Sequence, residues 1–397
     1  MLKKSLFTYS SILSVLFFIS CENKKNSNDY SNTLSKLKER TSVVELFENE
    51  GPSRLIVCPE LQGKIICSSY NGSKGQKNGW VAEAFYNSKK FDIKNIGGED
   101  RLWIGPLGSQ FSFYYQQIVP LSENNWKIPQ DLSSGIFHVN SKTNSKISMH
   151  RSIQLTNFIG TKFKLKIERN LNILDKVEIE NELSISLKPS IKYVAFESEN
   201  KLTNDGQIPH LKETGLVSLW SAGMFQGTDD TFVIVPLEGN ISKDSIYASM
   251  GKLTEERYRI EEDVLLFKTD GKYRSKIGVP SKFAPARYGC YSKSMNRLTL
   301  IEYTFNSTGK YSKTGPEFQK EPFIGEAIPV YNNGPMDLRM SKKSSFYELE
   351  SLSSMEELKP GESINHSHKV YHFSADFKEL QSLSKVLLGF DLIKLEL

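Results

Sequence analysis

The sequence predicts a mainly β protein, built as a large antiparallel β-sandwich with few short helices. After residue 47 apolar and polar side chains alternate with a period of two, which is typical of strands that bury one face. Strand-like runs do not alternate with long helical runs, as a doubly wound α/β fold requires. We therefore expect two packed antiparallel sheets.

The strand predictions rest on this alternation. In residues 162–168 every second side chain is apolar, which predicts one buried face. The same alternation at Val177 and Ile179 predicts a further strand. Other runs that we expect to be strands are residues 55–58, 64–70, 111–117, 231–237, 298–305 and 346–352.

Helices are expected near the two ends of the domain. Residues 34–47 are compatible with one short helix. At the C-terminal end Asp376 is placed as an N-cap with Glu379 three residues later, an apolar stripe follows, and Gly389 is expected to end the helix.

Two turns are expected from glycine. Asp270-Gly271 lies between residues 264–267 and 273–279, and this predicts a hairpin, because glycine tolerates the positive φ of a tight turn. A second turn is expected at residues 204–206.

The first residues have the pattern of a bacterial lipoprotein signal. Lys3 and Lys4 form a positive region, residues 6–19 are mostly apolar, and small Ser20 precedes Cys21. We expect residues 1–20 to be a signal peptide and Cys21 to carry the lipid. The alternative is an ordinary signal peptide with a chance cysteine.

This signal divides the chain and predicts its location. Polar residues 21–32 are expected to be a flexible spacer, and residues 33–397 a single domain. No second apolar run is long enough to cross a membrane, so the lipid is the expected anchor. We expect a protein of the cell envelope, lipid-anchored in the outer membrane and facing the periplasm or the exterior; the leaflet and the oligomeric state stay open.

Composition argues against two classes of partner. The 51 basic and 46 acidic residues are mixed along the chain and give a formal charge of +5, without the basic stripe of a nucleic-acid-binding protein. Glycine-rich phosphate motifs are absent, so no nucleotide cofactor is expected. The membrane is expected as a partner through the lipid alone.

Three cysteines remain after Cys21, namely Cys58, Cys67 and Cys290. An odd number does not describe a disulfide framework. Pairing of Cys58 with Cys67 is left open beside the alternative of buried thiols.

One glycine-bracketed stretch, residues 97–106, carries Arg101 and Trp103. These two side chains could form part of a sugar pocket, because an aromatic face stacks on the C–H surface of a sugar and a guanidinium bonds its hydroxyls. The alternative is a tight loop with an ion-paired arginine and a core tryptophan.

Carboxylates occur in two further candidate groups. On a strand Glu317 and Gln319 would share one face and could bind one substrate. Glu348 and Glu350 would also share a face, and paired carboxylates can act as acid and base or bind calcium. The alternative for both groups is exposure to solvent.

Three histidines lie close together in the sequence, at positions 366, 368 and 372. In an extended segment His366, His368 and His372 would lie on one face and could bind a divalent metal ion or exchange protons. The alternative is a polar strand face in solvent. No cofactor is certain from the sequence, and a divalent metal is a hypothesis tied to these residues.

The chain resembles a family of bacterial lipoproteins of unknown function, itself distantly similar to the galactose mutarotase-like (aldose 1-epimerase) superfamily. The motifs that carry the first resemblance span most of the mature chain: residues 97–106, 223–225, 270–278, 331–335, 346–350, 360–363, 366–368 and 372–373. The superfamily resemblance rests chiefly on Glu317, Gln319 and Pro322, which are similar to the Glu-x-Gln-x-x-Pro element of aldose epimerases.

The resemblance implies a mutarotase-like supersandwich with a sugar cleft. In such enzymes a glutamate takes the anomeric proton and a histidine protonates the ring oxygen, which would make Glu317 the base. If the protein is such an enzyme, the candidates for the acid are His366, His368 or His210. The superfamily's His-aromatic-Asn-Leu element has no match in this chain. Five residues are implied in substrate binding: Arg101, Trp103, Gln319, Glu348 and His368.

Three functions follow as hypotheses. The first is a membrane-anchored carbohydrate-binding lipoprotein with little or no catalysis. The second is a sugar epimerase, mutarotase or other carbohydrate-active enzyme that uses Glu317 as base. The third is a structural surface lipoprotein stabilised by a metal ion. The identity of the sugar stays open.

Overall fold

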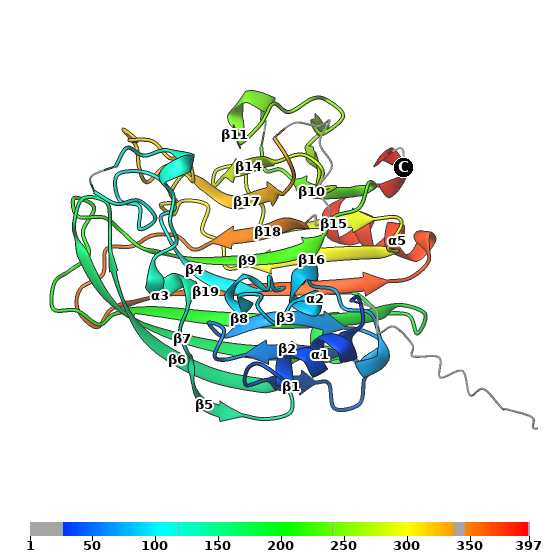
Figure 1. Ribbon diagram of the computed structural model, residues 1–397. Helices are drawn as coiled ribbons and strands as arrows, with labels where there is room; N and C mark the ends of the chain where they lie inside the picture. Colours follow the sequence, from blue (N-terminus) through cyan, green and yellow to red (C-terminus); the bar gives the residue numbers. More distant parts are fainter. Residues whose placement is uncertain (1–26, 118, 240, 337–345, 396–397) are drawn as a thin grey trace, which may run out of the picture.

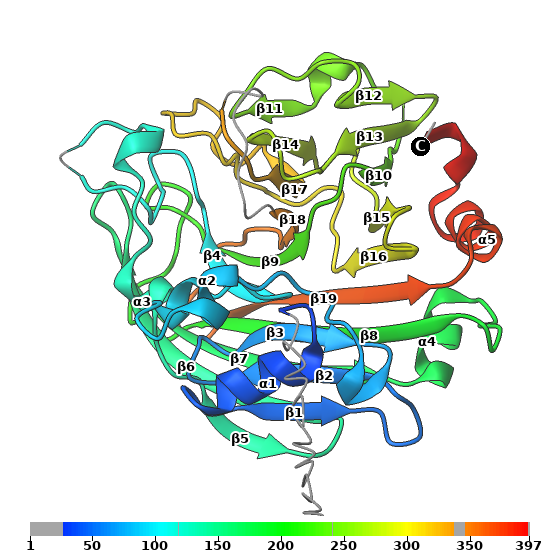
Figure 2. The same ribbon diagram turned by 45° about the vertical axis from the view of Figure 1, so that its right-hand side comes forward.

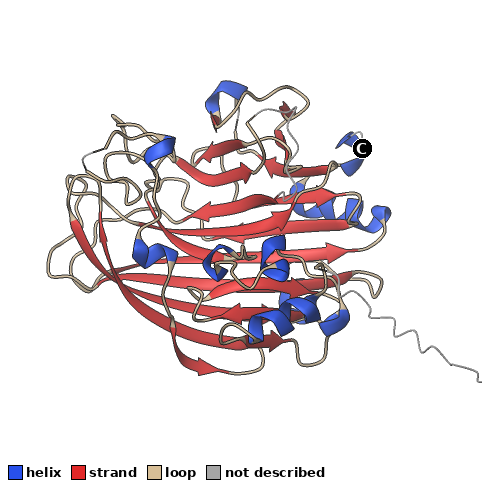
Figure 3. Ribbon diagram, viewed as in Figure 1, coloured by secondary structure: helices blue, strands red, loops and turns tan. Residues whose placement is uncertain are grey.

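The computed structural model describes residues 27–117, 119–239, 241–336 and 346–395, and these are mostly β-strands (Figures 1 and 3). In the described residues the strands form three sheets in which all neighbouring strands are antiparallel. The prediction of a mainly β, antiparallel fold with few helices is therefore confirmed. The predicted signal of residues 1–20 and the lipidated Cys21 lie outside the described residues.

The largest sheet has ten strands and curves around the other two (Figure 2). Its strands in spatial order are β12 (Tyr258–Glu261), β13 (Val264–Lys268), β10 (Thr231–Pro236), β15 (Arg287–Ser292), β16 (Arg297–Tyr303), β19 (Ser363–Ser374), β8 (Lys192–Asn204), β7 (Lys162–Leu174), β6 (Lys146–Thr156) and β5 (His138–Lys142).

Two smaller sheets lie on the inner side of this curve (Figure 2). The six-stranded sheet contains β11 (Tyr247–Ser249), β14 (Ser275–Pro280), β17 (Glu326–Asn332), β18 (Phe346–Leu352), β9 (Ser218–Gln226) and β4 (Arg101–Gly105). The three-stranded sheet contains β1 (Val44–Phe47), β2 (Arg54–Cys58) and β3 (Lys64–Ser69).

Short helices cover parts of the sheets. α4 (Lys176–Leu183) and α5 (Phe377–Leu388) pack on the outer face of the ten-stranded sheet, while α1 (Tyr30–Lys38) and α2 (Glu83–Asn87) pack on the three-stranded sheet. α3 (Gln130–Ser133) lies in the connection between β4 and β5. Short 3-10 helices occur at Gly72–Lys74, Ile93–Asn95, Glu123–Asn125, Lys243–Ser245 and Leu392–Leu395.

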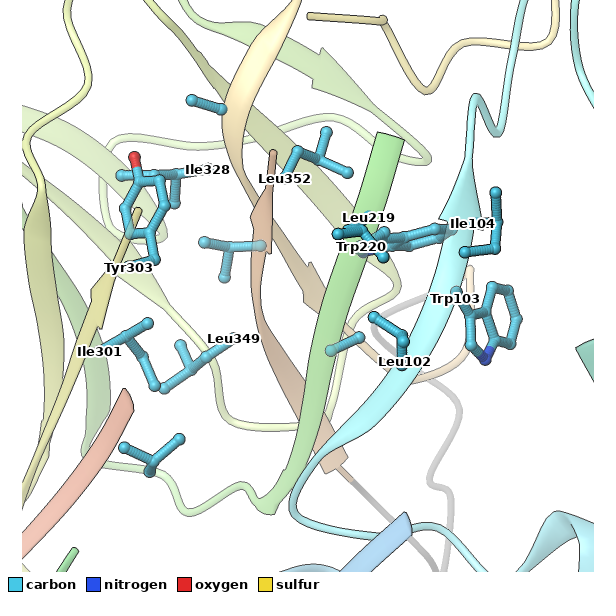
Figure 4. Close-up of a cluster of buried hydrophobic side chains, with 14 of the residues drawn as sticks. Leu102, Trp103, Ile104, Leu219, Trp220, Ile301, Tyr303, Ile328, Leu349 and Leu352 are labelled. Atoms are coloured by element: carbon cyan, nitrogen blue, oxygen red, sulfur yellow. The ribbon is translucent and has the colours of Figure 1, made fainter. Parts of the chain in front are cut away.

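The main core fills the space between the sheets. Figure 4 shows Leu349 of β18 close to Ile301 of β16, so apolar side chains of the six-stranded sheet meet those of the ten-stranded sheet. On β7, Phe163, Leu165 and Ile167 are buried as predicted. Burial of these apolar faces supplies the main driving force for folding.

The C-terminal helix is confirmed in its position and both of its ends. The side chain of Asp376 accepts a hydrogen bond from the backbone N–H of Glu379, and the helix ends at Gly389 with φ 63°. The strand predictions over residues 55–58, 64–70, 231–237, 298–305 and 346–352 are confirmed as β2, β3, β10, β16 and β18.

Two predicted elements have a different secondary structure. The helix expected over residues 34–47 ends at Lys38, and Val44–Phe47 forms β1 because it pairs with β2. Val177 and Ile179 lie in α4, which begins with a capping box between Asp175 and Glu178 that overrides the alternating pattern.

Two further predictions differ in how the chain connects. Residues 111–117 form a loop instead of a strand, with residues 111–115 buried. The turn at Asp270-Gly271 exists, with φ 69° at Gly271, but it joins two different sheets, because β13 pairs with β10 while β14 pairs with β11 and β17. The predicted spacer is also too long: Tyr30, inside residues 21–32, starts α1 and is fully buried.

The cysteines of the domain are buried thiols. Cys58 and Cys67 lie on the adjacent strands β2 and β3, yet both are free, as is Cys290. The alternative of buried thiols is therefore the correct one.

A buried polar layer joins the three sheets. The guanidinium of Arg169 on β7 donates to Asp100 Oδ2 (2.6 Å), Asn200 Oδ1 (2.7 Å) and the carbonyl oxygen of Gly63 (3.1 Å). Gly63 directly precedes β3 and Asp100 directly precedes β4. Burial raises the pKa of Asp100, but the Arg169 guanidinium outweighs it and holds this pKa below its ordinary value.

The two outer strands of the ten-stranded sheet expose polar or charged side chains. All five residues of β5 are exposed, and a bulge interrupts its pairing with β6 between Val139 and Ser141. At the other end β12 carries the ion pair Arg259–Glu261 (2.5 Å). No helix in the described residues is long and apolar enough to span a membrane.

We expect Asp100→Asn to destabilise the protein by about 3–5 kcal/mol, because it leaves the buried Arg169 without a counter-charge. Urea unfolding followed by circular dichroism measures this free energy. As a control, Glu262→Gln removes the exposed Lys394–Glu262 pair and should change stability by at most about 1 kcal/mol. Equal effects of the two substitutions would contradict the role given to Arg169.

Candidate functional site

A cavity of about 290 Å³ lies against the six-stranded sheet, and its tryptophans Trp103 and Trp220 also belong to the main core. Four of its lining residues come from four adjacent strands and are direct cross-strand partners: Lys276 on β14, Tyr331 on β17, Glu348 on β18 and Met224 on β9. This register aligns four side chains in one row across the floor of the cavity.

β4, a second residue of β9 and four connections complete the walls. Arg101 and Trp103 come from β4, where residues two positions apart share one face. The rest of the lining consists of Leu107, Tyr115, Trp126, Ile128, Trp220, Met250, Arg274, Thr314 and Pro316.

One wall of the cavity is aromatic. The ring of Trp103 is stacked on that of Trp126 with centroids 6.0 Å apart, and it meets Trp220 edge-on at 5.0 Å. Figure 4 shows Trp103 and Trp220 beside each other on β4 and β9. Trp126 is 36% exposed, so part of this aromatic surface is accessible to a ligand.

Two ion pairs lie against the aromatic wall. The guanidinium of Arg101 donates to Glu348 Oε1 (2.9 Å) and lies 4.2 Å from the centre of the Trp103 ring. Glu350, the neighbour of Glu348 on the same strand face, accepts hydrogen bonds from Lys276 Nζ (3.2 Å). These contacts fix the positions of charged groups around an apolar surface.

The carboxyl group of Glu348 has an unusual acidity. Burial raises its pKa to about 7, Arg101 acts in the opposite direction, and the negative charge of Glu350 adds to the increase. Near neutral pH both protonation states of Glu348 are therefore populated. The group can donate a hydrogen bond to a ligand in one state and accept one in the other.

The structure brings together three of the five residues predicted to bind substrate: Arg101, Trp103 and Glu348. For Arg101 both interpretations hold, since it is ion-paired and also lines the cavity. Gln319 and His368 do not line the cavity.

Glu317, the predicted base, lies in the connection between β16 and β17, where its side chain is exposed and is not part of the cavity lining. The expectation that Glu317 and Gln319 share a strand face is wrong, because this segment is a loop. Gln319 is buried, and the side-chain amide of Gln110 donates to its carbonyl oxygen and accepts from its backbone N–H (both 3.1 Å).

The three clustered histidines lie on one face of β19, as predicted, but that face is buried, so the solvent-facing alternative is wrong. His366 Nε2 and His368 Nδ1 each lie 2.8 Å from the hydroxyl of Ser351. Burial lowers the pKa of His366 to about 3 and that of His368 to about 4, so both rings are neutral at pH 7.

The third histidine has separate partners. His372 Nε2 lies 2.6 Å from Glu99 Oε1, and its Nδ1 lies 2.8 Å from the hydroxyl of Thr299. No group of three or more His, Cys, Asp or Glu side chains in the described residues is arranged to hold a metal ion. The structure therefore gives no support to a metal site at His366, His368 and His372.

The remaining candidate acid, His210, is also remote from the cavity. It is buried against the ring of Phe163, with centroids 4.7 Å apart. Burial lowers the pKa of His210 to about 4. It does not line the cavity either.

Sequence reasoning missed several lining residues. Trp220, Arg274, Lys276 and Tyr331 lie within or near the motifs that carry the family resemblance, but they were not assigned a role. Trp126 lies in none of these motifs. The only feature of the sequence that points to a binding role for it is that a tryptophan occurs in a polar, loop-like segment.

The family model that covers nearly the whole domain matches residues 28–397. The chain belongs to the family of unknown function DUF6786. The resemblance to a family of unknown function is thereby confirmed. No curated protein matches the chain.

Solved structures with a similar fold include proteins named for sugar chemistry. A protein from Escherichia coli K12, provisionally assigned as an aldose 1-epimerase, has a TM-score of 0.51 at 10% identity over 83% of this chain and 98% of its own. A galactose mutarotase-like protein from Lactobacillus casei has a TM-score of 0.48 at 11% identity over 83% of this chain and 100% of its own. The likeness to the Escherichia coli structure shows that the DUF6786 chain shares the sandwich fold of that aldose 1-epimerase-like protein.

We expect Glu348→Gln to change how stability depends on pH. Because the folded-state pKa of Glu348 lies above its ordinary value, its contribution to the free energy of unfolding is fully present below about pH 4.5 and is lost as pH rises through about 7. The stability of the wild type relative to Glu348→Gln should therefore fall over this range.

Urea unfolding at about pH 4.5, 6 and 8 measures this difference. Glu302→Gln, at a partly exposed ion pair with Arg287, is the matched control and should show no such trend. A wild-type advantage that stays constant or grows with pH would refute the assignment.

Proposed function

We propose that the protein binds carbohydrate in the cavity on the six-stranded sheet. The observation that carries this proposal is the partly exposed aromatic wall of Trp103, Trp126 and Trp220 beside the Arg101–Glu348 pair. Aromatic faces pack on the C–H surface of a pyranose, while a guanidinium and a carboxyl group offer donors and acceptors to its hydroxyls.

The size and composition of the cavity fit a small polar ligand with apolar faces. Its volume of about 290 Å³ lies at the small end of ligand cavities, which are about 300–1,000 Å³. A single sugar unit is the expected occupant. The galactose mutarotase-like fold supports the proposal only by analogy, since one fold hosts many functions.

We favour binding over sugar isomerisation. An acid and a base must both reach the reacting sugar for ring opening. Glu317 is exposed outside the cavity lining, and His366 is buried, neutral and held by Ser351. The two residues predicted for these roles therefore do not face the same ligand.

We expect Trp126→Ala to weaken sugar binding about 2- to 13-fold, because one stacked aromatic contact contributes about 0.5–1.5 kcal/mol. Isothermal titration of full-length protein in detergent with glucose, galactose, mannose and their uronic acids measures the affinities. Trp80→Ala, a tryptophan outside this cavity, is the matched control. The proposal fails if the wild type binds none of these sugars at millimolar concentration, or if Trp126→Ala leaves the affinities unchanged.

We also propose that the domain is held at a membrane of the cell envelope by lipid on Cys21. The support is the sequence pattern of residues 1–21 together with the described domain, which begins only a few residues later with α1. Cys21→Ser should move the protein from the membrane fraction to the soluble fraction and abolish incorporation of labelled palmitate. Cys290→Ser, at a buried thiol, should do neither. Unchanged fractionation and labelling of Cys21→Ser would refute lipid attachment.

A further inference from the structure

Arg274 differs from the other cationic groups of the cavity. Arg101 is paired with Glu348 and Lys276 with Glu350, whereas Arg274 forms no ion pair within the described chain. The Nε atoms of Arg274 and Arg101 are both buried without a hydrogen-bond partner, so the difference between the two is the missing ion pair of Arg274. A guanidinium without a counter-charge, facing a cavity, is a ready site for an anionic ligand group.

The backbone of Arg274 is fixed by a hydrogen bond and by the strand that follows it. Its backbone N–H donates to the carbonyl oxygen of Pro335 (2.9 Å), and the following residues continue as β14. Its guanidinium lies next to the hydroxyl of Tyr331. Burial raises the pKa of Tyr331 to about 12, and the positive charge of Arg274 limits this increase. The tyrosine hydroxyl therefore stays protonated, and it donates to Asn333 Oδ1 (3.1 Å).

We propose that the ligand of this cavity is an acidic sugar, a pyranose whose carboxylate is bound by Arg274. This inference rests on the proposed carbohydrate function and specifies its substrate class. The sugar ring lies against the aromatic wall, and Arg101 with Glu348 contacts its hydroxyls.

A carboxylate suits the site better than a more highly charged group. The guanidinium presents two parallel N–H donors that match the two oxygens of a carboxylate. Arg101 and Lys276 each have an acidic partner, so among the described lining residues Arg274 is the cation that a single carboxylate would provide with a counter-charge. A sulfate ester also carries one charge, but its three oxygens are not planar, so a direct comparison separates the two.

The acidic groups close to the cavity do not oppose this assignment. Glu350 is neutralised by Lys276, and Glu348 is paired with Arg101 and partly protonated near neutral pH. Glu326 on β17 is fully buried, and its Oε1 accepts a hydrogen bond from the backbone N–H of Thr314 (3.1 Å). Burial raises the pKa of Glu326. Arg274 thus remains the charge that a ligand anion would meet.

The test compares neutral and acidic sugars of the same configuration. Methyl galactopyranoside, methyl galactopyranosiduronate and galactose 6-sulfate, with the corresponding glucose compounds, are titrated into full-length protein in detergent. We expect the uronates to bind at least about 10-fold more tightly than the neutral sugars, as a charge-assisted pair predicts. Added salt should reduce this preference.

Variants at position 274 assign the preference to one side chain. Arg274→Gln should lose the preference for uronates over neutral sugars, and Arg274→Lys should restore it in part because the charge returns without the fork. Arg287→Gln is the control: it removes an arginine of β15 that is paired with Glu302, and it should keep the full preference for uronates.

The outcomes separate the two proposals. If neutral sugars and uronates bind equally well, or if Arg274→Gln keeps the preference, the acidic sugar is refuted while carbohydrate binding stands. Tighter binding of the sulfate ester would refute the carboxylate. If no sugar of any class binds, the proposed function itself fails.

Discussion

The arrangement of the three sheets depends on one buried guanidinium. Arg169 takes hydrogen-bond partners from β8 of its own sheet, from the residue before β3 and from the residue before β4. A charge removed from water is tolerated only when its donors are satisfied and its counter-ion is near, so each sheet must keep its place relative to the others. Apolar contacts between the sheets would tolerate small shifts, whereas these directional bonds do not.

The position of Asp100 also fixes part of the cavity, because the next residue in the chain lines it. Asp100, the counter-ion of Arg169, is followed directly by Arg101, which pairs with Glu348 and covers the ring of Trp103. The same β4 backbone is thus anchored in the core on one side and presents the binding groups on the other. The local sequence around residues 97–103 therefore serves both stability and recognition.

The sequence predicts features that depend on neighbouring residues, but not features that depend on how distant segments pair. The ends of α5 follow from Asp376 and Gly389, and the pairing of Arg101 with Trp103 on one face follows from strand geometry. The row formed by Lys276 and Tyr331 depends on the register of separate strands, which a single sequence does not reveal. Glu317 was misplaced because a motif resemblance cannot show that its segment is a loop with an exposed carboxylate.

The side chains of the two outer strands affect how two copies of the chain can meet at the edges of the ten-stranded sheet. An unpaired strand edge normally invites a second chain to extend the sheet, but β5 is bulged and exposed and β12 carries a charged pair. Two copies that meet at these edges are therefore kept from joining their ten-stranded sheets into one, so this sheet stays the property of a single chain.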